Sequence, residues 1–126
     1  MVNGVNWMRE NVVKNKSFAF AVRIVKLYQF LCNQKKEFVL SKQLLRSGTS
    51  VGAMIREAEH AETKKDFIHK MGLAQKEINE TIYWLELLRE TEYLTEEHFD
   101  SLNEDAIEII KLATAILRKA KSNINH

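Results

Sequence analysis

The sequence predicts an all-α protein folded as an antiparallel, up-down-up-down four-helix bundle, and three observations favour this fold. The 126 residues include no proline and only four glycines, so the residues that most often interrupt helices are rare. Apolar residues recur at alternating spacings of three and four over long stretches, which places them on one face of each helix. The connections between these stretches are short, and short connections make neighbouring helices antiparallel. The length predicts one domain over residues 1–126.

The first helix is expected over about residues 17–34, beginning near Ser17 or a turn or more before it. Between residues 18 and 32 only three side chains are polar, and they form a narrow stripe at every third position. The stretch Lys35–Phe38 is expected to connect this helix to a second one over about residues 42–61, which Ser41 is expected to cap.

The third helix is expected over about residues 64–90. Thr63 and Asp66 have the spacing of a capping box, which marks a helix start. The apolar positions that follow alternate by three and four, as in bundle helices that cross at about 20°. The predicted core positions are Phe67, Met71, Ala74, Ile78, Ile82, Leu85 and Leu88.

The fourth helix is expected over about residues 96–122. Thr95 is a good N-cap residue, and Glu96 and Glu97 complement the positive end of the helix dipole. The apolar spacing continues without a break to the end of the predicted helix. Its core positions are Phe99, Leu102, Ala106, Ile109, Ala113, Ile116 and Ala120.

The stretch RSGTSVGA, residues 46–53, is unusually rich in small residues for the middle of a helix. Glycine there costs roughly 1 kcal/mol relative to alanine. Gly48 and Gly52 lie four apart and therefore on one face, where small residues let two helix backbones approach closely. A large side chain such as Trp84 or Tyr83 could cover this groove, whereas the alternative is a flexible break. The candidates for close packing or subunit contact are Gly48, Gly52, Ala53, Tyr83, Trp84, Phe18 and Phe20.

Two segments carry more apolar surface than one bundle core can bury. Residues 18–32 and residues 82–88 are apolar over most of the helix circumference, and such helices are buried on nearly all sides. Because each helix of a four-helix protomer has an outward side, the sequence predicts a homo-oligomer that covers these sides. The alternative is that the termini, including Trp7 and Met8, fold back over them.

The net charge is only +2, but it is unevenly distributed along the chain. Residues 1–56 carry a net charge of +8, residues 57–110 one of −10, and residues 111–126 one of +4. This asymmetry indicates either an interaction surface or neighbouring helices of opposite sign that attract each other, and we favour the second. The single cysteine, Cys32, excludes an internal disulfide and favours a cytoplasmic location. No apolar run approaches the roughly 20 residues of a membrane span, so no membrane association is expected.

No motif in the sequence predicts catalysis, a metal or a cofactor. Di-iron bundles need two Glu-x-x-His pairs, and here only Glu57 and His60 have that spacing. The acidic clusters around Glu77 and Glu96 lack the second half of the magnesium motif of helical pyrophosphohydrolases. A glycine-rich phosphate loop is missing too. We therefore expect a protein that is not an enzyme.

Nucleic-acid binding and a scaffold or protein-binding role are the two remaining functional hypotheses. Basic side chains repeated around an oligomer could form a band that releases counterions from RNA or DNA. Against this, the protomer is nearly neutral, and we expect no aromatic residue within an exposed basic loop where bases could stack. The candidate nucleic-acid contacts are Arg23, Lys26, Lys35, Lys36, Lys42, Arg46, Arg118, Lys119 and Lys121.

The stretch Leu40–Leu88 resembles the 23S rRNA-intervening sequence proteins of bacteria. The shared features are the L-x-x-Q-L-x-R-S start, the small-residue stretch before A-E, the K-K-D-F helix start and the later Y-W-L-x-L-L run. The preceding KSFAFAVRIVKLYQFL is similar to the first helix of that family, so the likeness covers roughly residues 12–120.

This resemblance implies four antiparallel helices and a ring-shaped homopentamer with a central channel. It also implies a relation to the accessory proteins of diversity-generating retroelements, which share the barrel and are associated with nucleic acid and a reverse transcriptase. Many members carry I-P-S-N-I where this chain reads Val51-Gly-Ala-Met-Ile55. No role of that asparagine can therefore be transferred to this chain.

Overall fold

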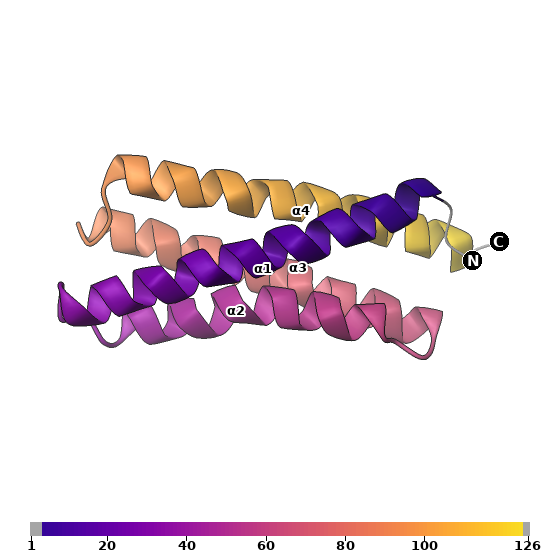
Figure 1. Cartoon of the computed structure of the whole chain (residues 1–126), viewed down its shortest axis with the longest axis horizontal. Coiled ribbons are helices and arrows are strands. Elements are labelled where there is room, and N and C mark those ends of the chain that lie inside the picture. The colour runs from indigo at the N-terminus through magenta and orange to yellow at the C-terminus, as the bar shows by residue number, and fades with distance from the viewer. Residues whose placement is uncertain (1–3, 125–126) are drawn as a thin grey trace.

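The fold consists of four long helices joined by short turns. The structure is a computed structural model, which describes the backbone of residues 4–124 and the side chains of residues 7–123. The helices are α1 (Gly4–Asn33), α2 (Leu40–Glu59), α3 (Lys64–Glu90) and α4 (Glu96–Ile124). They alternate in direction, and each packs against its two neighbours, α1 and α3 both lying between α2 and α4 (Figure 1). Within the described range there is no strand, and the all-α prediction is confirmed.

Helix α1 begins much earlier than the sequence predicted, at Gly4 instead of near Ser17. The reason is that its core seam extends toward the N-terminus, where Val13 is only 1% exposed. Because four helices alternate in direction, the beginning of α1 and the end of α4 lie at the same end of the bundle (Figure 1).

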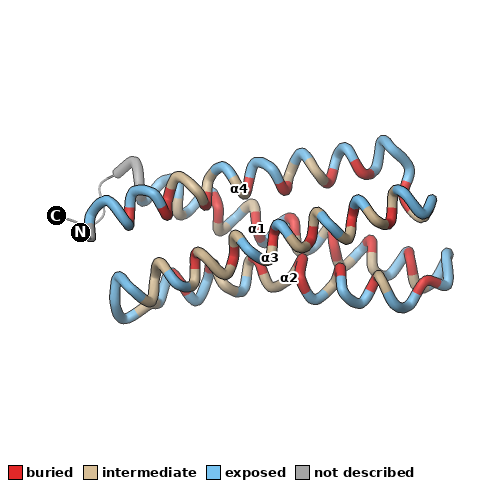
Figure 2. Tube along the Cα trace, turned by 180° about the vertical axis from the view of Figure 1, so that it is seen from behind, coloured by how far each residue is buried: buried red, intermediate tan, exposed pale blue. Residues whose placement is uncertain are grey.

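The core follows the predicted seams closely (Figure 2). All seven predicted positions of α4 are buried. In α3 two of the seven predicted positions, Phe67 and Ile82, are only half-buried, and Thr81, next to Ile82, is fully buried instead. The Thr81 hydroxyl lies 3.0 Å from the hydroxyl of the buried Ser47 and 2.8 Å from the Glu77 carbonyl. The Ser47 hydroxyl in turn lies 3.4 Å from the Leu44 carbonyl, so both hydroxyls have partners and a polar pair replaces an apolar contact between α2 and α3.

The glycine-rich stretch of α2 packs against α1. A Cβ atom on Gly48 would lie 2.7 Å from Cγ2 of Ile24, and one on Gly52 would lie 3.4 Å from the backbone oxygen of Ser17. The residue over Gly48 is therefore Ile24 rather than Trp84 or Tyr83. Helix α2 is continuous through this stretch, so the alternative of a flexible break is wrong.

The start of α2 is stabilised by Glu37 and not by Ser41. The Glu37 carboxylate accepts hydrogen bonds from the backbone N–H groups of Val39, Leu40 and Ser41 at 2.7–2.8 Å. The Ser41 side chain instead donates to the Glu37 carbonyl at 2.8 Å, inside the first turn. The prediction of Ser41 as the cap was wrong, because the helix begins one residue before it.

Candidate functional site

The outward side of α1 carries a row of exposed apolar side chains, which we call the α1 face: Met8, Val12, Phe18, Val22 and Phe30. Their exposed fractions range from 39% for Val12 and Val22 to 61% for Met8. The helical period places these residues opposite the buried side of α1, which includes Phe20 and Ile24. The guanidinium of Arg56, from α2, lies 5.2 Å from the centre of the Phe18 ring and flanks this surface. Phe18 is thus an outward candidate, whereas Phe20 belongs to the protomer core.

The described N-terminal residues do not cover the α1 face. Trp7 and Met8 continue α1 as helix and are themselves about 60% exposed. They enlarge the apolar surface instead of shielding it.

A second exposed aromatic surface lies on α3. Tyr83 is 56% exposed, and its ring meets Trp84 edge to face with 5.0 Å between the centroids. The indole N–H of the half-buried Trp84 donates to Glu80 at 3.0 Å. Helices α1 and α3 are diagonal in the bundle (Figure 1). Because the α1 face and Tyr83 are both on the exposed sides of their helices, they lie on opposite sides of the molecule. Ala53 is exposed on the outside of α2.

Two of the basic candidates are held by carboxylates of the same protomer. Arg23 donates to Asp105 at 2.6 Å and to the Ser101 hydroxyl at 3.0 Å, which joins α1 to α4. Arg46 pairs with Glu77 and Glu80 of α3. Both guanidinium groups are therefore neutralised locally.

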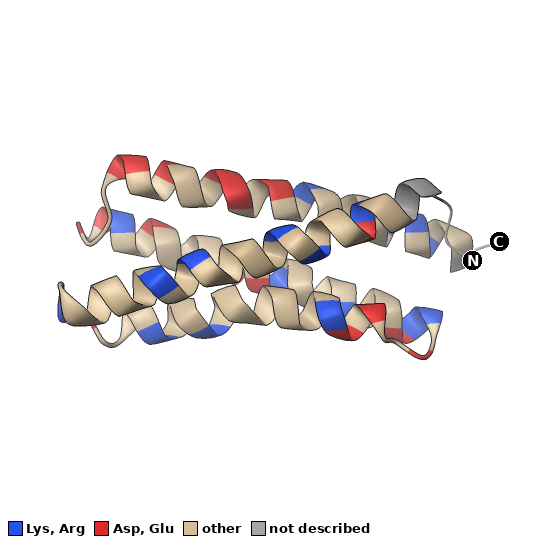
Figure 3. Ribbon diagram, viewed as in Figure 1, with Lys and Arg blue, Asp and Glu red and all other residues tan. Residues whose placement is uncertain are grey.

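The remaining candidates divide between the two ends of the bundle (Figure 3). One group lies where α1 ends and α2 begins, and the other lies on the last turns of α4. The structure does not bring the nine predicted residues into one patch. The first group is Lys26, Lys35, Lys36 and Lys42, and the second is Arg118, Lys119 and Lys121.

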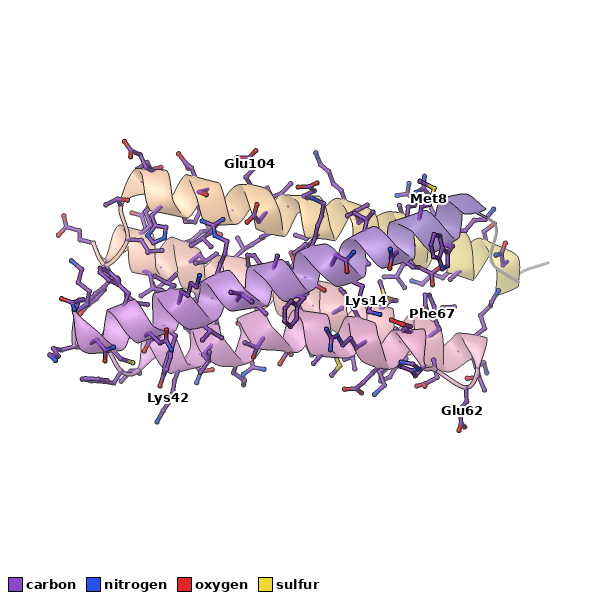
Figure 4. The ribbon with its side chains drawn as sticks, in the orientation of Figure 1. Met8, Lys14, Lys42, Glu62, Phe67 and Glu104 are labelled. Carbon is purple, nitrogen blue, oxygen red and sulfur yellow. The ribbon has the colours of Figure 1, made fainter. Side chains whose placement is uncertain are left out.

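The first group includes exposed aromatic side chains, and we call this surface the basic-aromatic end: Lys26, Phe30, Lys35, Lys36, Phe38 and Lys42. Phe38 is 54% exposed in the connection between α1 and α2. The Lys35 ammonium lies 5.9 Å from the centre of the Phe30 ring, and Lys42 points away from the bundle (Figure 4). The expectation that no aromatic residue lies in an exposed basic loop was wrong. The sequence signal for this surface was the KKEF stretch, in which Phe38 follows two lysines in a connection between helices.

Ion pairs join all four pairs of neighbouring helices. They connect α1 to α2, α1 to α4, α2 to α3 and α3 to α4. Of these helices, α1 and α4 are the neighbours with clearly opposite net charges. The pairs are Lys14–Glu59, Lys16–Glu108, Arg23–Asp105, Arg46–Glu77, Arg46–Glu80, Lys70–Glu57 and Arg89–Glu96.

The acidic side chains near His60 are partners in two of these ion pairs. Glu57 pairs with Lys70 at 2.7 Å and Glu59 pairs with Lys14 at 2.9 Å. In the part of the chain that the structure describes, no three His, Cys, Asp or Glu side chains are grouped as metal ligands would be. The same part contains no helix that is long and apolar enough to span a membrane.

Together these features define an all-helical protein with apolar and basic-aromatic surfaces on a bundle whose neighbouring helices are bridged by ion pairs. The 23S rRNA-intervening sequence protein family matches residues 9–115. The chain belongs to this family.

A solved structure of similar sequence has the same fold. The chain is similar to a crystal structure, at 1.70 Å resolution, of a protein of unknown function from the S23 ribosomal protein family of Bacteroides thetaiotaomicron. The two share 61% identity with a TM-score of 0.87, and the match covers 87% of this chain and 98% of the other. A search of the curated proteins returned no match.

Proposed function

We propose that the protein is a non-enzymatic homo-oligomeric module, a ring in which the α1 face of one subunit meets the α3 side of the next. The observation that supports this most strongly is the position of the two exposed apolar surfaces on opposite sides of the bundle. A contact between two different surfaces generates a ring when its rotation closes, whereas a twofold dimer joins one surface to itself. The resemblance to ring-forming pentamers favours five subunits.

The mass of the assembly in solution tests this proposal. Light scattering coupled to size exclusion should give a multiple of the 14.7 kDa protomer mass. The double variant Phe18→Gln/Val22→Gln should reduce that mass with little loss of helicity, because both side chains are exposed in the protomer. Ile107→Gln is the matched control, since Ile107 is 41% exposed on α4. A monomer at high concentration, or equal masses for the double variant and the control, would contradict the proposal.

A second candidate function is binding of single-stranded RNA or DNA at the basic-aromatic end. The exposed ring of Phe38 between Lys36 and Lys42 supports it, because bases stack on aromatic rings while lysines neutralise phosphates. Repetition around a ring would multiply this modest charge. A role beside a reverse transcriptase, as in the retroelement accessory proteins, stays a prediction.

Fluorescence titration with a labelled single-stranded oligonucleotide at several salt concentrations tests this second function. Phe38→Ala should weaken binding with little change in salt dependence, whereas Lys36→Gln should reduce the salt slope by about one. Lys121→Gln, at the other end of the bundle, should change neither. Absence of binding at low salt, or equal losses from Lys36→Gln and Lys121→Gln, would eliminate this site.

A further inference from the structure

A cavity opens between α1, α2 and α3 near the end of the bundle where α1 begins. Its volume is about 120 Å³. Val13, Ile55, Phe67 and Met71 form an apolar wall, and Trp7 lies at the rim. An enclosed apolar cavity of about 150 Å³ in another protein accommodates one benzene molecule. The present cavity is somewhat smaller but open on one side, so a small ring fits it with one edge toward the solvent.

A neighbouring cavity of about 290 Å³ lies on the other side of Glu10 and Phe67, which line both spaces. Lys64 and Ile116 line this second cavity, toward α4. Figure 4 shows Phe67 near Lys14 in the space beside α1. The two cavities thus lie side by side, with the Glu10 carboxylate shared between them and a more polar lining in the second.

The polar groups of the first cavity leave one negative charge uncompensated. Lys14 and Glu59 neutralise each other at 2.9 Å. Among the described residues, no ion pair and no side-chain hydrogen bond engages the Glu10 carboxylate, although Lys64 and Lys119 line the second cavity. Burial, and to a smaller extent the charge of Glu59, raise the pKa of Glu10 above its ordinary value. A ligand cation at this carboxylate would relieve both effects.

We propose that this cavity binds a small organic cation, a primary amine that carries one apolar ring. The ring of the ligand packs against the side chains of Val13, Phe67 and Met71, and its ammonium group lies against the Glu10 carboxylate. The Trp7 indole at the rim supplies an aromatic face for the cation. A neutral ring of the same shape gains only the apolar contacts, so the site selects for charge. The observations behind this inference are separate from those behind the oligomeric and nucleic-acid proposals.

Two titrations test the proposal, one with benzylamine and one with benzyl alcohol. Binding is measured from the backbone amide chemical shifts in two-dimensional NMR spectra. Benzylamine should bind the full chain more tightly than the alcohol, with shifts concentrated around Glu10, Phe67 and Met71. Glu10→Gln should weaken benzylamine binding about tenfold and leave the alcohol unchanged, because it removes the charge and keeps the shape.

Two further variants complete the experiment. Trp7→Ala should also weaken amine binding, and Trp7 is exposed enough that the fold should tolerate the change. Glu97→Gln, an exposed carboxylate at the start of α4, is the control and should have no effect. Equal affinity for amine and alcohol, the same loss in Glu97→Gln, or shifts that lie away from this cavity would each overturn the proposal. So would a failure of benzylamine to bind at all.

Discussion

Glu37 shows how one side chain fixes the start of a helix. Burial disfavours its charged form, but the backbone N–H groups of Leu40, Ser41 and Val39, followed by the Ser41 hydroxyl, outweigh this effect and lower its pKa. The carboxylate thus satisfies several of the donors that a helix start leaves unpaired. Lys36, just before it, adopts a left-handed backbone with φ of 56°, which turns the chain into this cap.

Glu37→Ala should lower the free energy of unfolding by roughly 1–2 kcal/mol, as expected for the loss of a capping side chain. Glu104→Ala should have almost no effect, since Glu104 is exposed on α4 and points away from the bundle (Figure 4). Chemical denaturation of both variants measures the difference. Equal stabilities would show that the connection between α1 and α2 does not depend on this carboxylate.

The lowered pKa of Glu37 also fixes the sign of a pH effect. A carboxyl group whose folded pKa is depressed stabilises the protein above its unfolded pKa and loses that contribution as the pH falls through the folded value. The stability difference between the natural chain and Glu37→Gln should therefore be constant above about pH 5 and shrink below about pH 4. Thermal melts of both proteins across this range measure it, and a difference that grows toward low pH would contradict the assignment.

At the scale of elements, the contact between α1 and α2 depends on two glycines that are not equivalent. At Gly48 a methyl group would collide with the branched body of Ile24, whereas at Gly52 it would meet Ser17 at ordinary contact distance. The same substitution should therefore have opposite consequences within one helix turn.

Gly48→Ala should destabilise the fold by roughly 1–3 kcal/mol through overpacking. Gly52→Ala should be neutral or stabilise it by up to about 1 kcal/mol, because alanine is the better helix former. Gly72→Ala is a useful reference, since nothing lies within 4 Å of a Cβ at that position of α3. Urea unfolding of the three variants gives the order, and a Gly48→Ala protein as stable as Gly52→Ala would refute the packing account.

Comparison of elements with the sequence shows which features were predictable. All seven positions predicted for the seam of α4 are buried, because strict alternation of three and four leaves only one inward face; Leu117 is a further buried residue beside them. The start of α1 was missed because, of the apolar side chains in its described first turns, only Val13 is buried, whereas Trp7, Met8 and Val12 are exposed and do not mark the seam. The burial of Thr81 was missed because the spacing of apolar residues favours the neighbouring Ile82 as the core position. The Ser47 hydroxyl that makes burial of the Thr81 hydroxyl possible lies on another helix.

The candidate surfaces were less predictable than the fold. The sequence identified excess apolar residues on the first and third helices, but it could not show that they point to opposite sides. It also grouped Arg23 and Arg46 with the free lysines, because partners such as Asp105 lie far away in the chain. Local pattern indicates which side chains are available, whereas pairing between distant helices decides which of them stay free.

For the whole molecule, interhelical ion pairs should make stability weakly dependent on salt. Most of the paired side chains are substantially exposed, so each pair contributes at most about 1 kcal/mol and is screened by salt. Raising NaCl from about 0.05 to 0.5 M should lower the Tm by only a few degrees. Calorimetry at fixed protein concentration measures this, and a large fall would mean that charge pairing, not the apolar core, dominates the fold.

The beginning of α1 and the end of α4 share one tip of the bundle, with the lysine-rich turn between α1 and α2 at the other (Figure 1). A fluorophore, affinity handle or fused domain attached at either terminus would therefore project away from Phe38 and Lys42. The protein can be tethered to a sensor surface by either terminus with that distal tip facing the solution.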